Sequence, residues 1–230
     1  MQEKLTVAPT TLESEHQANS AYEAIAALEL SSNPIERARQ IAQNTTAEGI
    51  LSAITGLHRA LAPDVPHVSS DVARTLQDPR TGEITSVLMD PNERVPFFER
   101  ASVVIRALGE QINPGEEQAF LNRAGNVLAL SVVLAHTFED GNGRTARTLA
   151  HAVRYGSEVT PSSQEEFDLV STNRPEQGFK INSYCPVKQG KDMSQGQLLE
   201  AAAAFDIPLS DQAAYQKHVD AHFAIPYTQA

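Results

Sequence analysis

Residues 124–135 read AGNVLALSVVLA, and almost every position in this stretch is apolar or small. A helix that is hydrophobic all round is buried all round in a globular protein. The stretch therefore predicts a helix at the centre of the core, around which the rest of the chain is organised. The chain leaves this helix at His136.

Helical spacing of apolar residues continues on both sides of the buried stretch. It is present at residues 50–61, 96–112, 144–155, 197–205 and 211–223. The segment Asn113-Pro114-Gly115-Glu116 has the residue types of a helix start, with Asn as the N-cap and Pro at the first helical position. We therefore expect the helix that leads into the buried stretch to begin there.

Between Leu76 and Pro91 the pattern changes to that of extended structure. Thr81-Gly82 is a turn signal, and the β-branched and aliphatic residues after it favour strands. The fold class is therefore predicted as all-α, mainly helical, with a small β-hairpin. We expect an N-terminal helical cap at 1–49 with a candidate regulatory role, a core domain at 50–156, and a covering or partner-binding segment at 157–230.

The composition limits the classes of partner. The chain has 230 residues with 18 Lys and Arg against 29 Asp and Glu, a formal net charge of −11. Such a molecule repels nucleic acid and anionic membranes, so neither is expected as a partner. Cys185 is the only cysteine, which excludes an intramolecular disulfide. The N-terminus lacks the pattern of an export signal, and the expected location is cytoplasmic.

Residues 136–147 read HTFEDGNGRTAR and lie between the buried helix and an amphipathic one. The glycine-rich part, Gly141-Asn142-Gly143, opens the second helix, and backbone N–H groups at a helix start can bind a phosphate. Arg144 and Arg147 are three residues apart, so both can bind the same anion. Cations at a helix N-terminus are unfavourable for the helix dipole, which indicates that they are placed there for an anion.

Two further residues of the loop supply reactive groups. Asp140 offers the hard oxygen ligand that a magnesium ion prefers, and His136 has a reference pKa near neutrality, as a general base requires. Taken singly, each has a simpler explanation: Asp-Gly-Asn-Gly is a common turn, Phe138 a core residue and His136 a structural histidine. The conjunction of all of them favours a phosphate-binding site.

This segment resembles the signature of the Fic family, which runs His, Pro, Phe, any residue, Asp or Glu, Gly, Asn, Gly, Arg, two residues, Arg. Every position matches except Thr137, where the family usually has Pro. Gly56-Leu57-His58-Arg59-Ala60-Leu61 resembles the helix that opens the Fic core, and residues 81–90 resemble the hairpin that the family calls the flap. The resemblance covers roughly residues 50–156.

The resemblance implies a protein adenylyltransferase that moves AMP from ATP to a Tyr, Thr or Ser hydroxyl of a target protein. His136 would deprotonate the hydroxyl and Asp140 would hold Mg²⁺. Phe138 would pack inward. The phosphates would be bound by Gly141, Asn142, Gly143, Arg144 on the β-phosphate and Arg147 on the γ-phosphate.

The resemblance also implies a docking feature and a regulatory one. The flap residues Ile84, Thr85, Ser86, Val87, Leu88 and Met89 either align the target segment or only close the core, and both interpretations stay open. Glu48 is the candidate inhibitory glutamate that would pair with Arg147, although Asn44 stands where such a motif has Ser or Thr. Control by a separate antitoxin-like chain, or no such control, also stays open.

Other functions are compatible with the sequence. The alternatives are a phosphotransferase, a transferase of UMP, GMP or phosphocholine on the same scaffold, and a nucleotide-binding module without catalysis. A metal-dependent hydrolase is a weaker alternative, because the sequence has no zinc-ligand cluster. A toxin or effector of this kind would act in the cytoplasm or after delivery to the cytosol of a target cell, and self-modification is a possible side reaction.

Overall fold

The computed structural model describes residues 22–65, 75–77, 84–87, 89–158, 194–207 and 211–223. Within them the chain is mainly helical with one antiparallel pair of short strands, which confirms the predicted fold class. The elements in chain order are α2 (Pro34–Asn44), α3 (Ala47–Leu61), β1 (Thr75–Gln77), β2 (Ile84–Val87), α4 (Pro91–Gly109), α5 (Glu117–Ala135), α6 (Asn142–Tyr155), α10 (Gln195–Ala202), the 3₁₀ helix η2 (Ala203–Asp206) and α11 (Gln212–Phe223).

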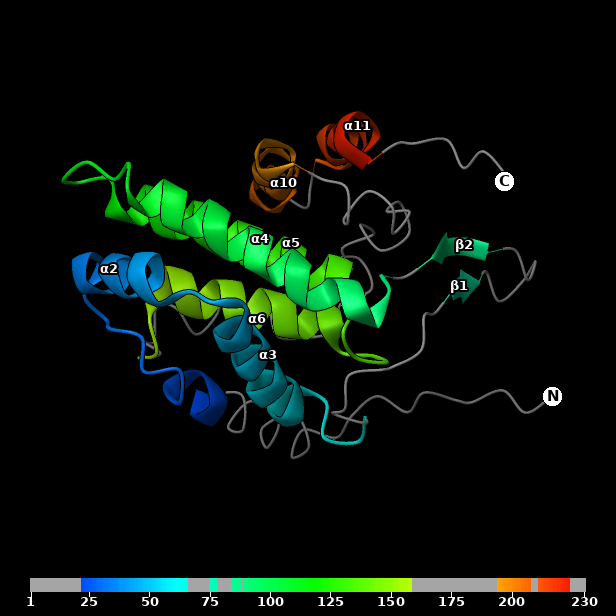
Figure 1. Ribbon diagram of the computed structural model, residues 1–230, viewed down its shortest axis with the longest axis horizontal. Helices are drawn as coiled ribbons and strands as arrows, with labels where there is room; N and C mark the ends of the chain where they lie inside the picture. The colour runs from blue at the N-terminus through cyan, green and yellow to red at the C-terminus, as the bar shows by residue number, and fades with distance from the viewer. Residues whose placement is uncertain are drawn as a thin grey trace.

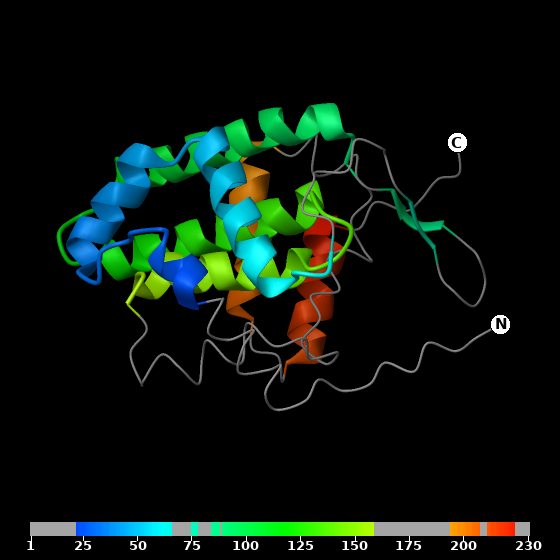
Figure 2. The same cartoon turned by 90° about the horizontal axis from the view of Figure 1, so that it is seen from below.

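Helix α5 is the centre of the bundle, as the apolar stretch predicts. Every residue from Ala124 to Ala135 is buried, and α5 packs against α6, α4, α2 and α10 (Figures 1 and 2). By length and composition α5 could span a membrane, but its neighbours bury most of it. Burial of this kind is typical of the core helix of a helical bundle.

The expected start of α5 is wrong by one turn. The helix begins at Glu117, and residues 113–116 form a turn in which Glu116 N–H donates to the Asn113 carbonyl at 3.0 Å. Gly115 has φ +92°, a left-handed conformation that no helical residue adopts. The Asn-Pro pair therefore starts a turn instead of a helix.

Helix α4 begins earlier than the apolar spacing predicts. Asp90 caps it by accepting a hydrogen bond from Asn92 N–H at 2.8 Å, and Pro91 occupies the first helical position. Met89 lies just before this cap and is 0 % exposed, so the connection from the hairpin to α4 is anchored in the core.

The N-terminal cap is tied to the far end of α6 by one buried arginine. The guanidinium of Arg37 in α2 donates to the carbonyls of Val153 and Arg154, and also to those of Ser31 and Ser32. Gly156, at φ +91°, ends α6 against this cluster, where an added Cβ would be 2.7 Å from the Ser31 carbonyl oxygen. The cap and the core are thus one packed unit in this part of the molecule.

Candidate functional site

His136 has a fixed position because helix α5 ends at this residue. His136 is the C-cap, with the left-handed angles φ 43° and ψ 55°, which are uncommon for a residue other than glycine. Its N–H donates to the Val132 carbonyl at 3.1 Å, and Arg94 donates to the Ala135 carbonyl at 3.1 Å. His136 is buried, with 8 % of its surface exposed, so the backbone determines where the imidazole lies.

Asn142 closes the loop on itself. Its side-chain oxygen accepts from Phe138 N–H at 3.1 Å, and its side-chain nitrogen donates to the Phe138 carbonyl at 2.8 Å. The resemblance implies that Asn142 binds a phosphate, and in the structure its side chain holds the backbone of Phe138. Asn142 is 2 % exposed, and what it can offer a phosphate is its backbone N–H at the start of α6.

Gly141 forms the N-cap of α6 and allows the loop to turn into the helix. Its φ of +77° favours glycine, and its carbonyl accepts from both the N–H and the hydroxyl of Thr145 at 2.9 Å. Its own N–H donates to Asp140 Oδ1 at 2.6 Å. The N–H groups of the first turn after it lie outside the helical hydrogen-bond ladder and carry the positive end of the helix dipole.

Arg144 and Arg147 lie on this positive end of α6. Arg144 donates one hydrogen bond to the Leu61 carbonyl at 2.7 Å, which joins α6 to the last turn of α3. Arg147 is buried, and its burial, with the nearby charge of Arg144 as a smaller cause, lowers the pKa of its guanidinium to about 10. A side chain at Gly143 would approach Arg147 Nη1 to 3.3 Å, so glycine there leaves room for this arginine.

Two cations at the positive end of a helix repel the helix dipole and each other. A bound anion removes both costs, and phosphate oxygens match the planar donors of arginine. The arrangement is therefore suited chemically to a phosphate group.

Asp140 presents an exposed carboxylate beside this anion site. Its Oδ1 accepts from Gly141 N–H, and its backbone carbonyl lies 2.9 Å from Nε2 of His58. A hard carboxylate oxygen next to a phosphate site suits Mg²⁺, which is commonly held by one or two carboxylates together with substrate phosphates. Among the described residues no group of three or more His, Cys, Asp or Glu side chains is arranged to hold a metal by itself.

His58 is a loop-contacting residue that the sequence argument missed. Its ring is fully buried on the last turn of α3 and stacks on Phe138 with centroids 3.8 Å apart. In the sequence His58 is only one of several scattered histidines. The helical spacing of α3 indicates a buried position, but the contact with the loop arises from tertiary packing.

The strands form the predicted antiparallel pair, with Thr75 opposite Val87 and Leu76 opposite Ser86. The pair projects from the end of the bundle at which the loop between α5 and α6 lies (Figures 1 and 2). Of the expected flap residues, Ile84 to Val87 form β2, while Leu88 and the Thr81-Gly82 turn lie outside the described residues. Met89 is buried in the core, so its side chain is not part of a docking surface.

Glu48 lies at the opposite end of α3 from the loop. It is exposed in the first turn of that helix, whereas Leu61 in the last turn contacts Arg144. With a rise of about 1.5 Å per residue, the distance along the helix axis from Glu48 to Leu61 is roughly 20 Å. Glu48 is therefore remote from the turn that Arg144 contacts, and its pairing with Arg147 stays a prediction.

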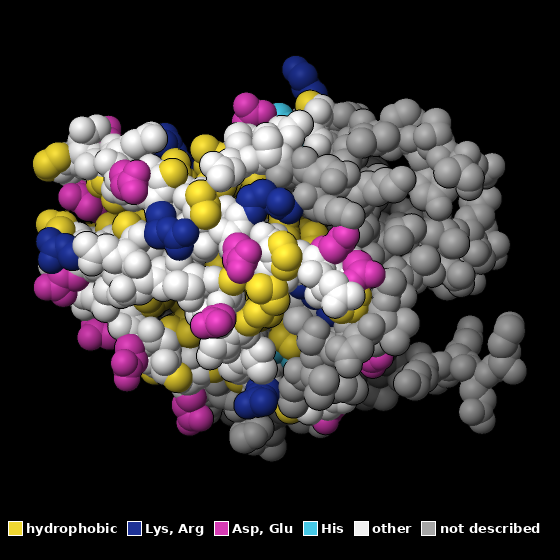
Figure 3. Space-filling model, in the orientation of Figure 1, with side chains coloured by type: hydrophobic (Ala, Val, Ile, Leu, Met, Phe, Trp, Pro, Cys, Tyr) yellow, Lys and Arg dark blue, Asp and Glu magenta, His cyan; other side chains and the backbone are white. Residues whose placement is uncertain are grey.

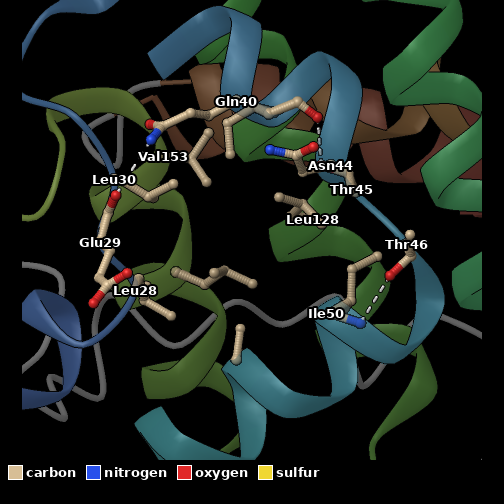
Figure 4. Close-up of a pocket in the computed structure, with 14 residues that line it drawn as sticks. Leu28, Glu29, Leu30, Gln40, Asn44, Thr45, Thr46, Ile50, Leu128 and Val153 are labelled. Carbon is tan, nitrogen blue, oxygen red and sulfur yellow. Dashed lines mark hydrogen bonds between the residues drawn. The ribbon is translucent and has the colours of Figure 1, made fainter. Parts of the chain in front are cut away.

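The cavity drawn in Figure 4 is separate from the loop. It has a volume of about 350 Å³ and lies between residues 28–30, α2, α3, α5 and α6. Leu28, Leu30 and Leu128 point into it, and no residue of 136–147 lines it. It is a gap between the cap and the core and contributes nothing to the anion site.

The outer surface carries both charges. On the face shown in Figure 3, acidic and basic side chains are interspersed and neither kind gathers into a patch. The two arginines of the site lie at the start of α6, in a chain with a net charge of −11.

Comparison with known proteins gives one match. Residues 49–153 match the model of the Fic/DOC family, a span that contains nearly all of α3, the strands, α4, α5, the loop and nearly all of α6. No curated protein and no solved structure gave a significant match. The family match supports a Fic-type transferase in general.

Proposed function

Because residues 49–153 form a Fic domain, we propose that this protein is an adenylyltransferase that moves AMP from ATP to a Tyr, Thr or Ser hydroxyl of a target protein. One observation carries the proposal. A single loop joins a histidine fixed at the end of a buried helix to two arginines at the start of the next helix. Nucleotidyl transfer needs a base and an anion site next to each other, and the loop supplies both.

His136 acts as the general base in this proposal. A ring nitrogen accepts the proton of the target hydroxyl while the hydroxyl oxygen forms a bond to the α-phosphorus. The bond from the α-phosphorus to the bridging oxygen breaks, and pyrophosphate leaves with the electron pair. The products are AMP joined to the target oxygen, pyrophosphate, and a proton on His136.

The start of α6 stabilises the charge of the triphosphate. The first-turn N–H groups, with Gly141 and Gly143 permitting close approach, bind the α- and β-phosphates, Arg144 the β-phosphate and Arg147 the γ-phosphate. Burial of Arg147 strengthens its attraction for an anion, because less water screens the charge. Phe138 and Asn142 keep the loop in the required shape.

Asp140 is the proposed ligand for Mg²⁺. When bound, the metal would neutralise phosphate charge and orient the leaving group. Asp140 suits this role because its carboxylate is exposed and oriented at Oδ1 by the Gly141 N–H, while its backbone carbonyl is held by His58.

The target segment is proposed to add a strand to the edge of β2 that does not pair with β1, along residues 84–87. The expected location of this reaction is the cytoplasm, or the cytosol of a cell to which the protein is delivered. Self-modification and an antitoxin-like inhibitor are further proposals from the same scaffold.

The decisive experiment is incubation of the protein with Mg²⁺ and ATP labelled on the α-phosphate, with and without a cell lysate. We expect label on protein with wild type, and a loss of about 10² to 10⁴-fold in rate with His136→Ala. His222→Ala, the same substitution on α11, should label like wild type.

Other labels separate the alternatives. Transfer of the γ-label would replace the proposal by a phosphotransferase, and transfer from UTP, GTP or CDP-choline would change the donor. ATP binding without transfer of any label, to the protein itself or to any protein of the lysate, would favour a nucleotide-binding module.

A further inference from the structure

His58 makes two contacts with the loop from one buried ring. The ring stacks on Phe138 with an interplanar angle of 14°, and its Nε2 lies 2.9 Å from the carbonyl oxygen of Asp140. A carbonyl oxygen only accepts hydrogen bonds, so Nε2 must carry the proton and donate it. The ring therefore contacts both the hydrophobic anchor of the loop and the backbone of its acidic residue.

The hydrogen bond to Asp140 also determines the orientation of the next peptide group. A trans peptide is planar, so the Asp140 carbonyl and the Gly141 N–H point in opposite directions. The Gly141 N–H donates to Asp140 Oδ1 at 2.6 Å. The hydrogen bond from His58 to the Asp140 carbonyl therefore also fixes the direction of the Gly141 N–H, and this N–H holds the Asp140 carboxylate.

The loop backbone lies directly against the ring. A Cβ placed on Gly141 would be 3.2 Å from both Cδ2 and Nε2 of His58, and 3.1 Å from the Ala62 Cβ. Arg144 binds the Leu61 carbonyl on the same turn of α3. The last turn of α3 is thus the surface on which residues 140–144 rest.

We infer that His58 is a positioning residue that orients the Asp140 carboxylate for the metal. The inference rests on the proposed function, in which Asp140 holds Mg²⁺. His58 acts through the Nε2 hydrogen bond to the Asp140 carbonyl, while its stacking on Phe138 supports the fold of the loop. Loss of the hydrogen bond should weaken metal-dependent nucleotide binding more than it weakens the fold.

Calorimetry with the α,β-methylene analogue of ATP tests this, with and without Mg²⁺. His58→Phe keeps an aromatic ring against Phe138 and removes the donor. We expect its metal-free affinity to match wild type, while the gain in affinity on adding Mg²⁺ falls about tenfold or more, as for other residues that support a metal ligand. His58→Gln restores a donor and should recover most of that gain.

His151→Phe is the matched control, because His151 is also a buried histidine but lies outside the loop, with its ring tilted by 49° against that of Tyr155. It should retain the wild-type gain from Mg²⁺. A folded His58→Phe with the wild-type gain overturns the inference and leaves the proposed function intact. Absence of any gain from Mg²⁺ in wild type overturns the proposed metal role and the inference together.

Melting temperatures of all variants show which of them fold. If His58→Phe does not fold, His58→Gln decides. The inference requires its gain to stay within about threefold of the wild-type gain, a smaller change than the tenfold or more that loss of a supporting residue produces. A folded His58→Gln that loses the whole gain overturns it, because the donor would then not be the group that matters.

Discussion

Each end of α6 meets a buried arginine, and the two arginines are placed in opposite relation to the helix dipole. At the C-terminal end, Arg37 donates to the carbonyls of residues 153 and 154, where a cation is favourable. At the N-terminal end, Arg147 lies beside Arg144, where cations are unfavourable. Burial lowers the pKa of both guanidinium groups. We infer from this difference that Arg37 holds the fold, whereas Arg147 is placed for an anion, as the proposed function requires.

The largest expected effect is on transfer, at the N-terminal end. Arg147→Met keeps the bulk of the side chain and removes the charge that binds the triphosphate, so the rate of α-label transfer should fall by about 10²-fold or more. Its free energy of unfolding should fall by less than that of Arg37→Met, because Arg147 lies beside a second cation, Arg144, at the positive end of a helix. Urea unfolding and labelling on the same preparation check both. A marked loss of stability would show that Arg147 holds the fold as Arg37 does.

At the C-terminal end the same substitution should act on stability. Arg37→Met leaves four carbonyl groups without their buried donor, at a cost of about 3 to 5 kcal/mol in the free energy of unfolding. Urea unfolding measures this loss. Corrected for the folded fraction, transfer should remain close to wild type, and a folded Arg37→Met that fails to transfer would contradict the division between the two ends.

Low pH should destabilise the folded protein through His151 in α6. Burial, with Arg154 as the smaller cause, lowers the pKa of His151 from 6.5 to about 4. The unfolded chain takes up this proton near pH 6.5 and the folded chain only near pH 4, so folding loses stability as the pH falls between these values. The loss is up to about 3 kcal/mol. His151→Phe should remove this part of the pH dependence, measured by urea unfolding at pH 7 and pH 4.5. An unchanged dependence would assign the effect to other groups.

A smaller effect, on stability, is expected at Thr137, which follows His136 in the loop. Its hydroxyl is buried without a hydrogen-bond partner in the structure, so Thr137→Val should raise the free energy of unfolding by about 1 kcal/mol. Thermal unfolding with transfer as a second readout tests this. A decrease in stability would indicate that a water molecule satisfies the hydroxyl.

The smallest effect is expected at Glu48. Because it lies at the far end of α3 from the loop, Glu48→Gln should change transfer by less than about twofold, within the scatter of a surface substitution. Strong activation of labelling would show that the chain rearranges to bring Glu48 to the arginines.

The sequence predicts the core of this fold well because α5 is apolar on every side and residues 136–147 combine rare residue types in a short stretch. The sequence does not predict features that depend on a single backbone angle or on a contact between residues distant in sequence. Gly115 turns the chain at a site with the composition of a helix cap, and only the structure decides that Met89, for which the sequence left two interpretations open, is buried in the core. His58 contacts the loop only through the packing of α3 against α6, which residue spacing within either helix does not reveal.

The contact between Arg37 and the end of α6 also bears on cooperativity. Residues 31–37 and 153–154 are far apart in sequence, yet the same guanidinium holds both. Opening of either segment would break the hydrogen bonds of the other, so the amide hydrogens of α2 and of the last turn of α6 should exchange with solvent as one unit. The span matched by the family model begins at residue 49, after α2, and a fragment cut there would lose half of that exchange unit.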